Sequence, residues 1–483
     1  MPEFFLRVEA VNLGNTILDT DNISTRRGGG LMLLNSVALL QKNLPVSHGN
    51  RLIPIATGAS IGLFQFTATD NVDAENLRKT VESQLRDNKG DIPLHHATFV
   101  VDVVPVDSSP DQAHQLAIAA NRWRQMQSMS LSLSDLFNTK ALGPCFYDRS
   151  RPGTHLNVKL PGNKTENLSD SVYLRRKYGR TARQEFYHEE IPEFPKDVHF
   201  TDDLGELSDA TNLNREQAPT DTRGKLALIY LDGNQFGSHG RDKWKTHSAV
   251  ENFRNWSKAL RRHHRELLKN LLARAQVDPA WQTGNNRLIR LETLLWGGDE
   301  IIWVVPAWKG WEVVRWFLGQ PHIVEGKELT YGCGLVFCHA NAPIVSIDAL
   351  AHDLADSAKK EAAKSHVAYE VLESYDNDGG NFDSFYRRWM PPGEPQQHLL
   401  LTGAQLQAIE EPLRTIALSD DFPMRQLYML VHAWRQKQDI NPHKERLESS
   451  DAGCAVSRLR ESIGHDGAWL HLLQMLPYVP THE

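Results

Sequence analysis

The chain has 483 residues, of which 40% are hydrophobic and 23% charged, and its formal net charge is −7. This composition excludes a disordered chain, a collagen-like repeat and a disulfide-rich scaffold, and the length indicates two to four compact units. The excess of acidic over basic residues argues against a protein that coats nucleic acid over its whole surface. No apolar run approaches the roughly 20 residues of a membrane span, and the N-terminus lacks a signal-peptide pattern. We therefore expect a soluble, cytoplasmic protein with no membrane association.

The first 130 residues predict an alternation of strands and helices. A strand is expected over 4–14, a helix over 28–44, a hairpin over 51–68, a helix over 71–87, a strand over 96–107 and a helix over 111–127. Residues 135–222 are rich in Pro, Gly, Asn and charged side chains, which is typical of a loop-rich insertion.

The segment 225–372 repeats the same order. Its first strand, KLALIYLDG, ends on Asp232 and Gly233, and a helix is expected from Ser248. A hairpin follows over 287–308 with GGDE at its turn, then a helix over 308–320, a strand over 328–340, a helix over 346–365 and a strand over 366–374. This order predicts an antiparallel sheet with helices on one face, an α+β arrangement.

The two hairpins align, which indicates an internal duplication. The first copy has Thr57-Gly58 at its turn and Asn12 at the end of its first strand, where the second has GGDE and Asp232. Several helical stretches follow from about residue 382. We therefore predict four segments: a first palm-like domain with a degenerate site (1–134), the loop-rich insertion or linker (135–222), a second palm domain with the GGDE site (223–375) and a helical C-terminal domain (376–483).

Four cysteines stand at positions 145, 333, 338 and 454, with no CxxC pair. They are too few for a disulfide framework. We expect reduced thiols and no structural zinc site.

The acidic residues of the second copy are the strongest chemical signal. If the strand that ends on Asp232 neighbours the hairpin, then Asp232, Asp299 and Glu300 converge at one edge of the sheet. Carboxylate oxygens are the ligands that Mg²⁺ and Mn²⁺ prefer, and such ions neutralise a triphosphate. An acidic pair at a hairpin turn is by itself more often ordinary solvated turn chemistry. The second acid, the strand order and the lysine-bearing helix that follows favour a site.

These motifs carry a family resemblance. GGDE between apolar strands, with IYLDGNQFG before it and SAKKEAAK after it, resembles the palm domain of the GGDEF and class III nucleotidyl cyclase superfamily. Within it, the chain is most similar to the polymerase-like large subunit of type III CRISPR effector complexes. The resemblance implies two ferredoxin-like palm domains plus a helical C-terminal domain, without the family's HD nuclease and its zinc-binding cysteines.

The resemblance also implies an activity and a set of site residues. The family joins nucleoside triphosphates 3′–5′ with two divalent ions, Mg²⁺ or Mn²⁺, typically into cyclic oligoadenylates. Carried over by position, the catalytic residues are Asp232, Asp299 and Glu300, and the metal ligands are Asp232, Asp299 and the Gly233 carbonyl. The nucleotide-binding residues of the second palm are Gly233, Asn234, Phe236, Gly297, Gly298, Lys359 and Lys364.

Two departures from the family pattern concern the acids. The turn reads GGDE where the CRISPR subunit usually has two aspartates, and Asn234 stands where some relatives carry an acid. In the first copy, Arg26 and Arg27 precede a glycine run and the expected helix, so they are candidates to hold the phosphate of a second nucleotide at a helix N-terminus. A polar turn that caps a surface helix fits them equally well.

Three functions remain open from the sequence. The leading hypothesis is an enzyme that converts a nucleoside triphosphate, ATP first, into a cyclic nucleotide or cyclic oligonucleotide messenger in antiviral defence. The alternative is a non-catalytic scaffold that binds guide RNA and smaller CRISPR effector subunits. A diguanylate cyclase is the third, although two palms in one chain are unusual for that class. Base identity, ring size, activating signal and oligomeric state stay open.

Overall fold

The computed structural model of the chain describes residues 1–16, 18–38, 40–44, 51–58, 60–87, 92–107, 109–128, 143–160, 164–284, 286–361, 363–372 and 387–481. The chain folds into two compact units, each assembled from segments that are distant in the sequence. Unit 1 comprises Met1–Pro195, Gln235–Leu268 and Leu294–Gly298. Unit 2 comprises Lys196–Asn234, Lys269–Thr293 and Asp299–Glu483.

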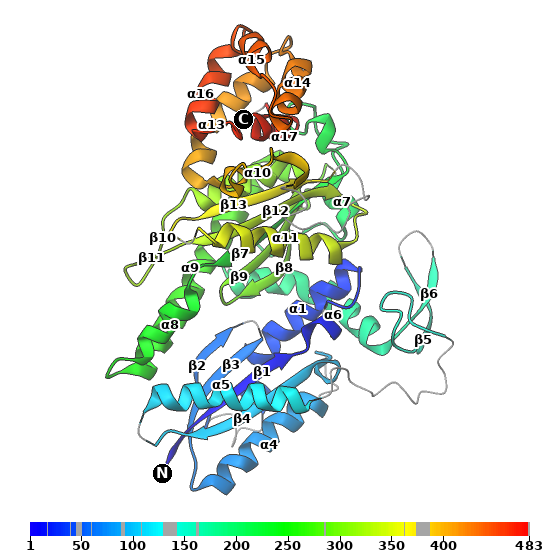
Figure 1. Ribbon diagram of the computed structural model, residues 1–483. Coiled ribbons are helices and arrows are strands. Elements are labelled where there is room, and N and C mark those ends of the chain that lie inside the picture. The colour runs from blue at the N-terminus through cyan, green and yellow to red at the C-terminus, as the bar shows by residue number, and fades with distance from the viewer. Residues whose placement is uncertain are drawn as a thin grey trace. The chain divides into compact units, whose positions relative to one another are not determined.

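Unit 1 contains an antiparallel four-stranded sheet in the order β2-β3-β1-β4 (Figure 1). Its strands are β1 (Glu3–Val11), β2 (Ile53–Gly58), β3 (Ile61–Thr67) and β4 (Thr98–Pro105), and its helical elements include η1 (Leu13–Asn15), α1 (Ile23–Ala38), α2 (Leu40–Asn43), α4 (Asn71–Asp87), η2 (Leu94–His96) and α5 (Pro110–Gln127). These elements follow the order predicted for the first copy.

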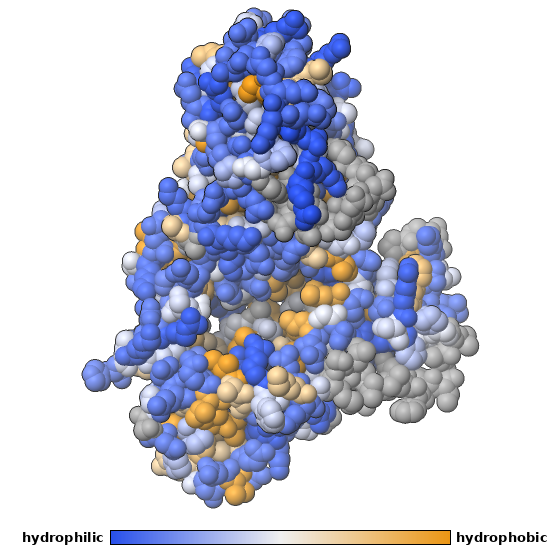
Figure 2. Space-filling model, viewed as in Figure 1, coloured by the Kyte–Doolittle hydropathy of each residue, from blue (hydrophilic) through white to orange (hydrophobic). Residues whose placement is uncertain are grey.

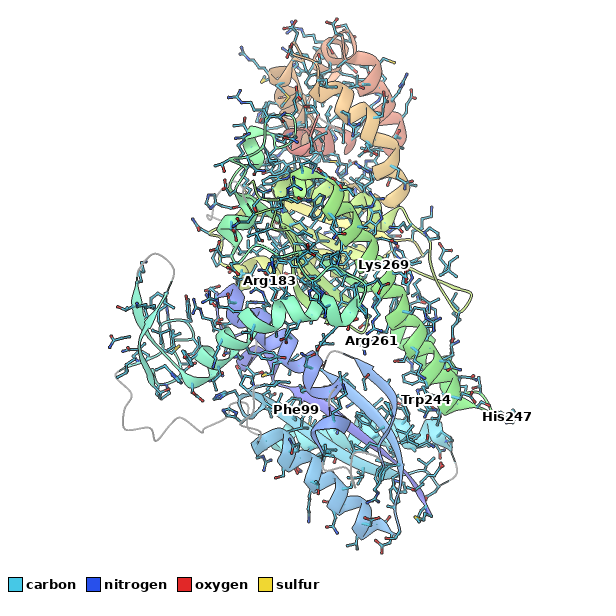
Figure 3. The ribbon with its side chains drawn as sticks, turned by 180° about the vertical axis from the view of Figure 1, so that it is seen from behind. Phe99, Arg183, Trp244, His247, Arg261 and Lys269 are labelled. Atoms are coloured by element: carbon cyan, nitrogen blue, oxygen red, sulfur yellow. The ribbon has the colours of Figure 1, made fainter. Side chains whose placement is uncertain are left out.

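Each face of this sheet has its own core because side chains alternate along a strand. Phe4, Leu6 and Val8 pack with apolar residues of α1 and α4. Phe5, on the opposite face, packs with residues of α5, α8 (Phe236–Trp244) and the start of α9 (Ala249–Val277). Figure 3 labels Trp244 at the end of α8, whose ring lies 5.8 Å from that of Phe5 between centroids.

The stretch 135–222 is not loop throughout, contrary to the expectation from its composition. It contains β5 (His155–Lys159), β6 (Thr165–Leu168), the 21-residue helix α6 (Asp170–Glu190), α7 (Leu204–Ser208) and η4 (Thr220–Thr222). Two basic residues of α6, Arg175 and Arg183, are buried, and Arg175 pairs with Asp19 at 2.9 Å. Composition misled here because paired charges allow a polar helix to be buried.

Unit 2 contains most of a six-stranded sheet in the order β14-β13-β12-β7-β9-β8. The strands are β7 (Lys225–Gly233), β8 (Glu292–Gly297), β9 (Glu300–Pro306), β12 (Tyr331–His339), β13 (His366–Val371) and β14 (Leu401–Thr402), and a separate hairpin joins β10 (His322–Val324) to β11 (Lys327–Leu329). The central strand β7 is antiparallel to both β9 and β12.

Two details of this sheet correct the prediction. β12 and β13 are parallel, because the chain crosses back through helix α11 (Ile344–Lys359). The helices also occupy both faces. Gly310 of α10 (Ala307–Leu318) lies against Ala227 and Phe337, whereas Gly332 and Gly334 of β12, which point the other way, lie against α11.

The C-terminal region is helical, as predicted. Its described helices include η6 (Gln396–Leu399), α13 (Gly403–Ala417), α14 (Met424–Arg435), α15 (Asn441–Glu448), α16 (Gly453–Ile463), α17 (Ala468–Met475) and η7 (Leu476–Tyr478). Elsewhere in the chain, the short helix η5 (Pro279–Trp281) follows α9. Hydrophilic residues cover most of the visible side of these helices in Figure 2. The α+β class is thus confirmed. Across the residues that the structure describes, no helix is both long and apolar enough to cross a bilayer.

The packing groups the chain differently from the four predicted segments. Helix α8 and the part of α9 up to Leu268, which the sequence places in the second palm, belong to unit 1 because they cover one face of its sheet. The C-terminal helices belong to unit 2 together with most of the second sheet. The segment boundaries themselves stay predictions.

Candidate active site

The central strand of the second sheet ends in an acidic residue that faces another. Asp232, near the end of β7, is opposite Glu300, the first residue of β9, in the antiparallel register. On the other side of β7, Asp232 is opposite Gly332 of β12. The apolar run of β7 is buried, so the strand carries Asp232 to the edge of the core with only 8% of its surface exposed. The two strands are neighbours, as the convergence of these acids requires.

The GGDE turn adds Asp299 to this edge. Gly298 and Asp299 form the two-residue turn between β8 and β9. Gly298 has a φ of +66°, a conformation that glycine adopts without a steric cost, and glycine at the first position is typical of tight hairpins. The Gly233 N–H donates a hydrogen bond to the Asp299 carbonyl oxygen at 2.9 Å. This bond ties the turn to the end of β7.

The surroundings of Asp299 raise the pKa of its carboxyl group. Burial is the largest influence on Asp299, and the charges of Asp232 and Glu300 act in the same direction, so that its pKa rises from 3.8 to about 6. Ionised carboxylates that lie close together and are partly buried repel one another electrostatically. A nearby positive charge is therefore favourable at this edge of the sheet.

Tyr230 is a fourth polar side chain of the cluster. It lies two residues before Asp232, hence on the same face of β7, and its hydroxyl donates to Glu300 Oε1 at 2.8 Å. Burial and the charges of Glu300 and Asp232 raise the pKa of Tyr230, so the phenol remains a donor. Its ring stacks on His352 of α11 with 3.8 Å between centroids. Tyr230 thus holds Glu300 in place.

Lys359, the last residue of α11, supplies a positive charge. Its Nζ donates to Asp232 Oδ2 at 2.7 Å, and its side chain is 30% exposed. The side chain reaches Asp232 by passing over Gly332, where an added Cβ would lie 2.4 Å from Lys359 Cγ. A glycine at position 332 therefore keeps open the path of the lysine.

Two other predicted residues of unit 2 make their hydrogen bonds outside the acidic cluster. Asn234 makes two hydrogen bonds to Thr330: its N–H donates to the carbonyl oxygen at 2.8 Å and its Nδ2 to Oγ1 at 3.0 Å. Lys364 was expected on the helix, but α11 ends at Lys359. Lys364 is exposed in the connection to β13, and its carbonyl oxygen is 3.1 Å from His366 Nδ1.

Three nucleotide-binding residues predicted for the second palm belong to unit 1. Phe236 is buried at the first position of α8. Gly297 and Gly298 line a cavity of about 60 Å³ together with Thr57 and Gly58, the turn of the first hairpin. This volume is below the roughly 300 Å³ of small-molecule sites.

The structure corrects the setting of Arg26 and Arg27. Helix α1 begins at Ile23, not at the glycine run, because Asn22 Oδ1 accepts the Thr25 N–H at 3.0 Å and caps the helix. Both arginines therefore lie inside the helix and are buried. Gly28 is where α1 approaches α6, since an added Cβ would lie 1.9 Å from the Arg175 carbonyl oxygen. The glycine run serves helix packing, and the helix N-terminus expected for the arginines is not there.

The donor set fits the metal that the resemblance implies. Asp232, Asp299 and Glu300 offer the hard oxygen ligands that Mg²⁺ and Mn²⁺ prefer. Burial raises the pKa of Asp299, and the charges of Asp232 and Glu300 raise it further, so negative charges crowd at this edge. A divalent cation would relieve this repulsion.

Sequence reasoning missed three residues of the site: Tyr230, His352 and Gly332. The first two carried a signal. Tyr230 is two residues from Asp232 in a strand, and His352 is seven residues before Lys359 in a helix, so each shares the face of a residue that was found. Gly332 carried no signal in the sequence, because its role depends on which helix packs against that position of β12.

Comparison with known proteins identifies the fold. No family model and no curated protein matches the sequence. Among solved structures, the Csm1–Csm4 cassette in complex with cA4 matches with a TM-score of 0.56 at 13% identity, over 100% of this chain and 70% of that chain. The chain has the fold of Csm1. Csm1 of T. onnurineus matches with a TM-score of 0.55 at 15% identity, over 98% of this chain and 69% of that one.

Another Csm1–Csm4 cassette, in complex with AMPPNP, matches with a TM-score of 0.54 at 15% identity, over 98% of this chain and 70% of that chain. Csm1 is the palm-domain large subunit of type III CRISPR complexes. The resemblance seen in the sequence is thus confirmed at the level of the fold.

Proposed function

We propose that this chain is a Csm1-like nucleotidyl cyclase that converts ATP into cyclic oligoadenylates in CRISPR-type antiviral defence. The observation that carries the proposal is the convergence of Asp232, Asp299 and Glu300 beside Lys359. Solved Csm1 structures of the same fold are complexes with AMPPNP, pppApA and cA4. They support adenine nucleotides as the substrate class.

The residues of this chain take complementary roles in the proposal. Asp232 and Asp299 would hold Mg²⁺ or Mn²⁺ together with the Gly233 carbonyl, and Glu300 would assist. When bound, the metal neutralises phosphate charge and activates the attacking hydroxyl.

Tyr230 keeps Glu300 oriented through its 2.8 Å hydrogen bond. Lys359 now pairs with Asp232, and it could release this partner and bind the triphosphate of the substrate instead.

The proposal extends to partners. The solved Csm1 chains occur in cassettes with Csm4. We propose that this chain likewise assembles with smaller CRISPR effector subunits, and with guide RNA through them.

The test is a product analysis. Purified protein is incubated with each of the four nucleoside triphosphates and Mg²⁺ or Mn²⁺, with and without added RNA, and the products are identified by mass spectrometry. The expected result is cyclic oligoadenylate from ATP. If every triphosphate stays unconverted in all conditions, the catalytic proposal is wrong and the scaffold function takes its place.

A further inference from the structure

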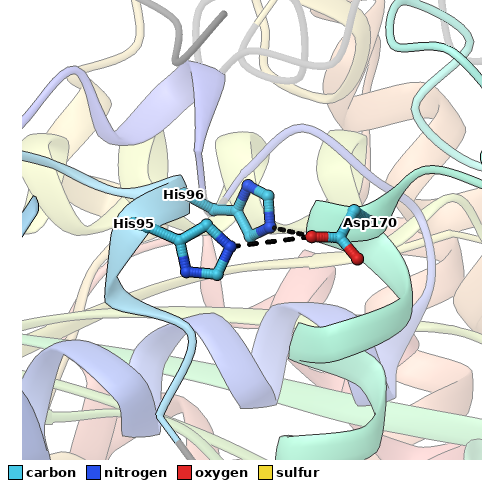
Figure 4. A group of neighbouring side chains, drawn as sticks. All are labelled: His95, His96 and Asp170. Carbon is cyan, nitrogen blue, oxygen red and sulfur yellow. Dashed lines mark hydrogen bonds and ion pairs between the residues drawn. The ribbon is translucent and has the colours of Figure 1, made fainter. Parts of the chain in front are cut away.

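Unit 1 contains a second cluster of side chains with metal-binding chemistry, which the proposed function does not use. His95 and His96 of η2 both point at the carboxylate of Asp170, the first residue of α6 (Figure 4). His96 Nε2 is 2.9 Å from Asp170 Oδ2, and His95 Nε2 is 3.6 Å from the same oxygen. In the described part of the chain, these three residues form a group whose ligand atoms all lie within 4.8 Å of one another.

These distances match the spacing of ligands around a small cation. A tetrahedral zinc ion with bonds of about 2.0–2.1 Å separates its ligand atoms by roughly 3.3 Å. The observed 2.9 Å and 3.6 Å bracket this value. All three ligand atoms, including the two imidazole nitrogens, lie within 4.8 Å of one another, so they are close enough to share one cation.

The surroundings hold the three side chains in place and leave access from solvent. The side chain of His96 is 3% exposed, that of His95 18% and that of Asp170 29%. His155 of β5 contacts the other carboxylate oxygen of Asp170 at 2.6 Å. His155 in turn stacks on Tyr173 with 4.0 Å between centroids. A ligand carboxylate held by a hydrogen bond on its second oxygen is the usual arrangement of metal sites.

We propose that His95, His96 and Asp170 bind one divalent transition-metal ion, of which Zn²⁺ fits best, and that His155 positions Asp170. Two imidazole nitrogens select such a metal over Mg²⁺ or Ca²⁺, which prefer all-oxygen sites. The expectation of no structural zinc site was based on the cysteines, and this cluster contains none.

The ion would cross-link two segments that are far apart in the sequence. His96 and Asp170 are 74 residues apart. Their elements are η2, which leads into β4 of the first sheet, and α6, which packs on α1. A metal that bridges them stabilises the folded unit, because the unfolded chain has no preformed site.

The test measures bound zinc directly. Untagged full-length protein is stripped with a chelator and dialysed against Zn²⁺ in excess Mg²⁺, and its zinc content is determined by inductively coupled plasma mass spectrometry. We expect one zinc per chain in the wild type and in Asp299→Ala, which lacks an acid of the other site. His96→Ala and Asp170→Asn should lose it, and His155→Ala should bind zinc roughly 10–100-fold more weakly.

A matched control and a second readout distinguish a specific loss of zinc binding from misfolding of a variant. His247→Ala removes an exposed histidine between α8 and α9 (Figure 3) and should keep its zinc. Zinc should raise the melting temperature of the wild type and of His247→Ala, and leave that of Asp170→Asn unchanged. A wild type without zinc would overturn the proposal. An Asp170→Asn variant that binds zinc like the wild type would overturn it too, because the zinc would then be bound outside this cluster. In either case the three residues form an ion-pair cluster without metal.

Discussion

Replacement of Asp299 by asparagine should stabilise the metal-free protein. The carboxyl of Asp299 lies in a partly buried turn beside two other acids, which together with burial raise its pKa from 3.8 to about 6. An amide of the same shape removes the charge and keeps the backbone of the turn. The ionised carboxylate of Asp299 should therefore lower the stability of the folded protein.

The structure sets the size and sign of the effect. At roughly 1.4 kcal/mol for each tenfold change in the ionisation equilibrium, a pKa raised from 3.8 to about 6 corresponds to about 3 kcal/mol. Below pH 3.8 the carboxyl is protonated in both states and costs nothing. Between pH 3.8 and 6 the folded state keeps a proton that the unfolded state has lost, so stability falls as the pH rises. Above pH 6 the full cost is present.

Urea unfolding in EDTA, followed by tryptophan fluorescence, measures this difference. Asp299→Asn should be more stable than the wild type by about 3 kcal/mol at pH 8, and by about 1 kcal/mol at pH 4.5. The exposed Asp420 provides the control, because Asp420→Asn should change stability by less than about 0.5 kcal/mol. An Asp299→Asn variant that is no more stable at pH 8, or equally stabilised at both pH values, would refute the reasoning.

Three further substitutions test the arrangement of the site. Gly332→Ala places a Cβ 2.4 Å from Lys359 Cγ and 2.7 Å from the Ala355 carbonyl oxygen, so it should cost about 1–3 kcal/mol in urea unfolding and lower the turnover of ATP. Tyr230→Phe removes the hydrogen bond to Glu300, which should cost about 1 kcal/mol and lower kcat roughly tenfold. Lys359→Met should raise the KM for ATP roughly tenfold, whereas Lys359→Arg should recover part of the loss.

Each of these has an outcome that contradicts it. A Gly332→Ala protein with unchanged stability would mean that α11 does not pack against β12 as described. An unchanged kcat in Tyr230→Phe would show that catalysis does not depend on the orientation of Glu300 by Tyr230. An unchanged KM in Lys359→Met would show that the lysine serves the folded protein and not the substrate.

The order of elements was predictable because it depends on local periodicity. The apolar run before Asp232 and the pair of runs around GGDE each specify a strand, and glycines at the turn specify a tight hairpin. The predicted convergence of the acids was conditional on these strands being neighbours. The antiparallel pairing of β7 with β9, which places Asp232 opposite Glu300, meets that condition.

What the sequence could not show depends on packing between distant segments. The parallel pairing of β13 and the placement of α10 and α11 on opposite faces are properties of the assembled sheet. The role of Gly332 depends in the same way on the path of Lys359. Arg26 and Arg27 are a different case. Asn22 is a helix-capping residue that the sequence displays before Ile23, so the helix begins ahead of the glycine run.

The histidine cluster was hidden for a third reason. His95 and His96 are adjacent in the sequence, but Asp170 and His155 come from an insertion that composition describes as loop. No spacing rule connects these positions, because η2, β5 and α6 come together only through the packing of unit 1.

The most direct test of the central claim compares the wild type with Asp299→Ala and Asp420→Asn in the conversion of ATP. Each protein is incubated with ATP and Mg²⁺, and cyclic oligoadenylate is quantified by mass spectrometry, with urea unfolding to verify that all three are folded. The account predicts product from the wild type and from Asp420→Asn, and none from a folded Asp299→Ala. Product from Asp299→Ala at the wild-type rate would contradict the assignment of the GGDE edge as the catalytic site.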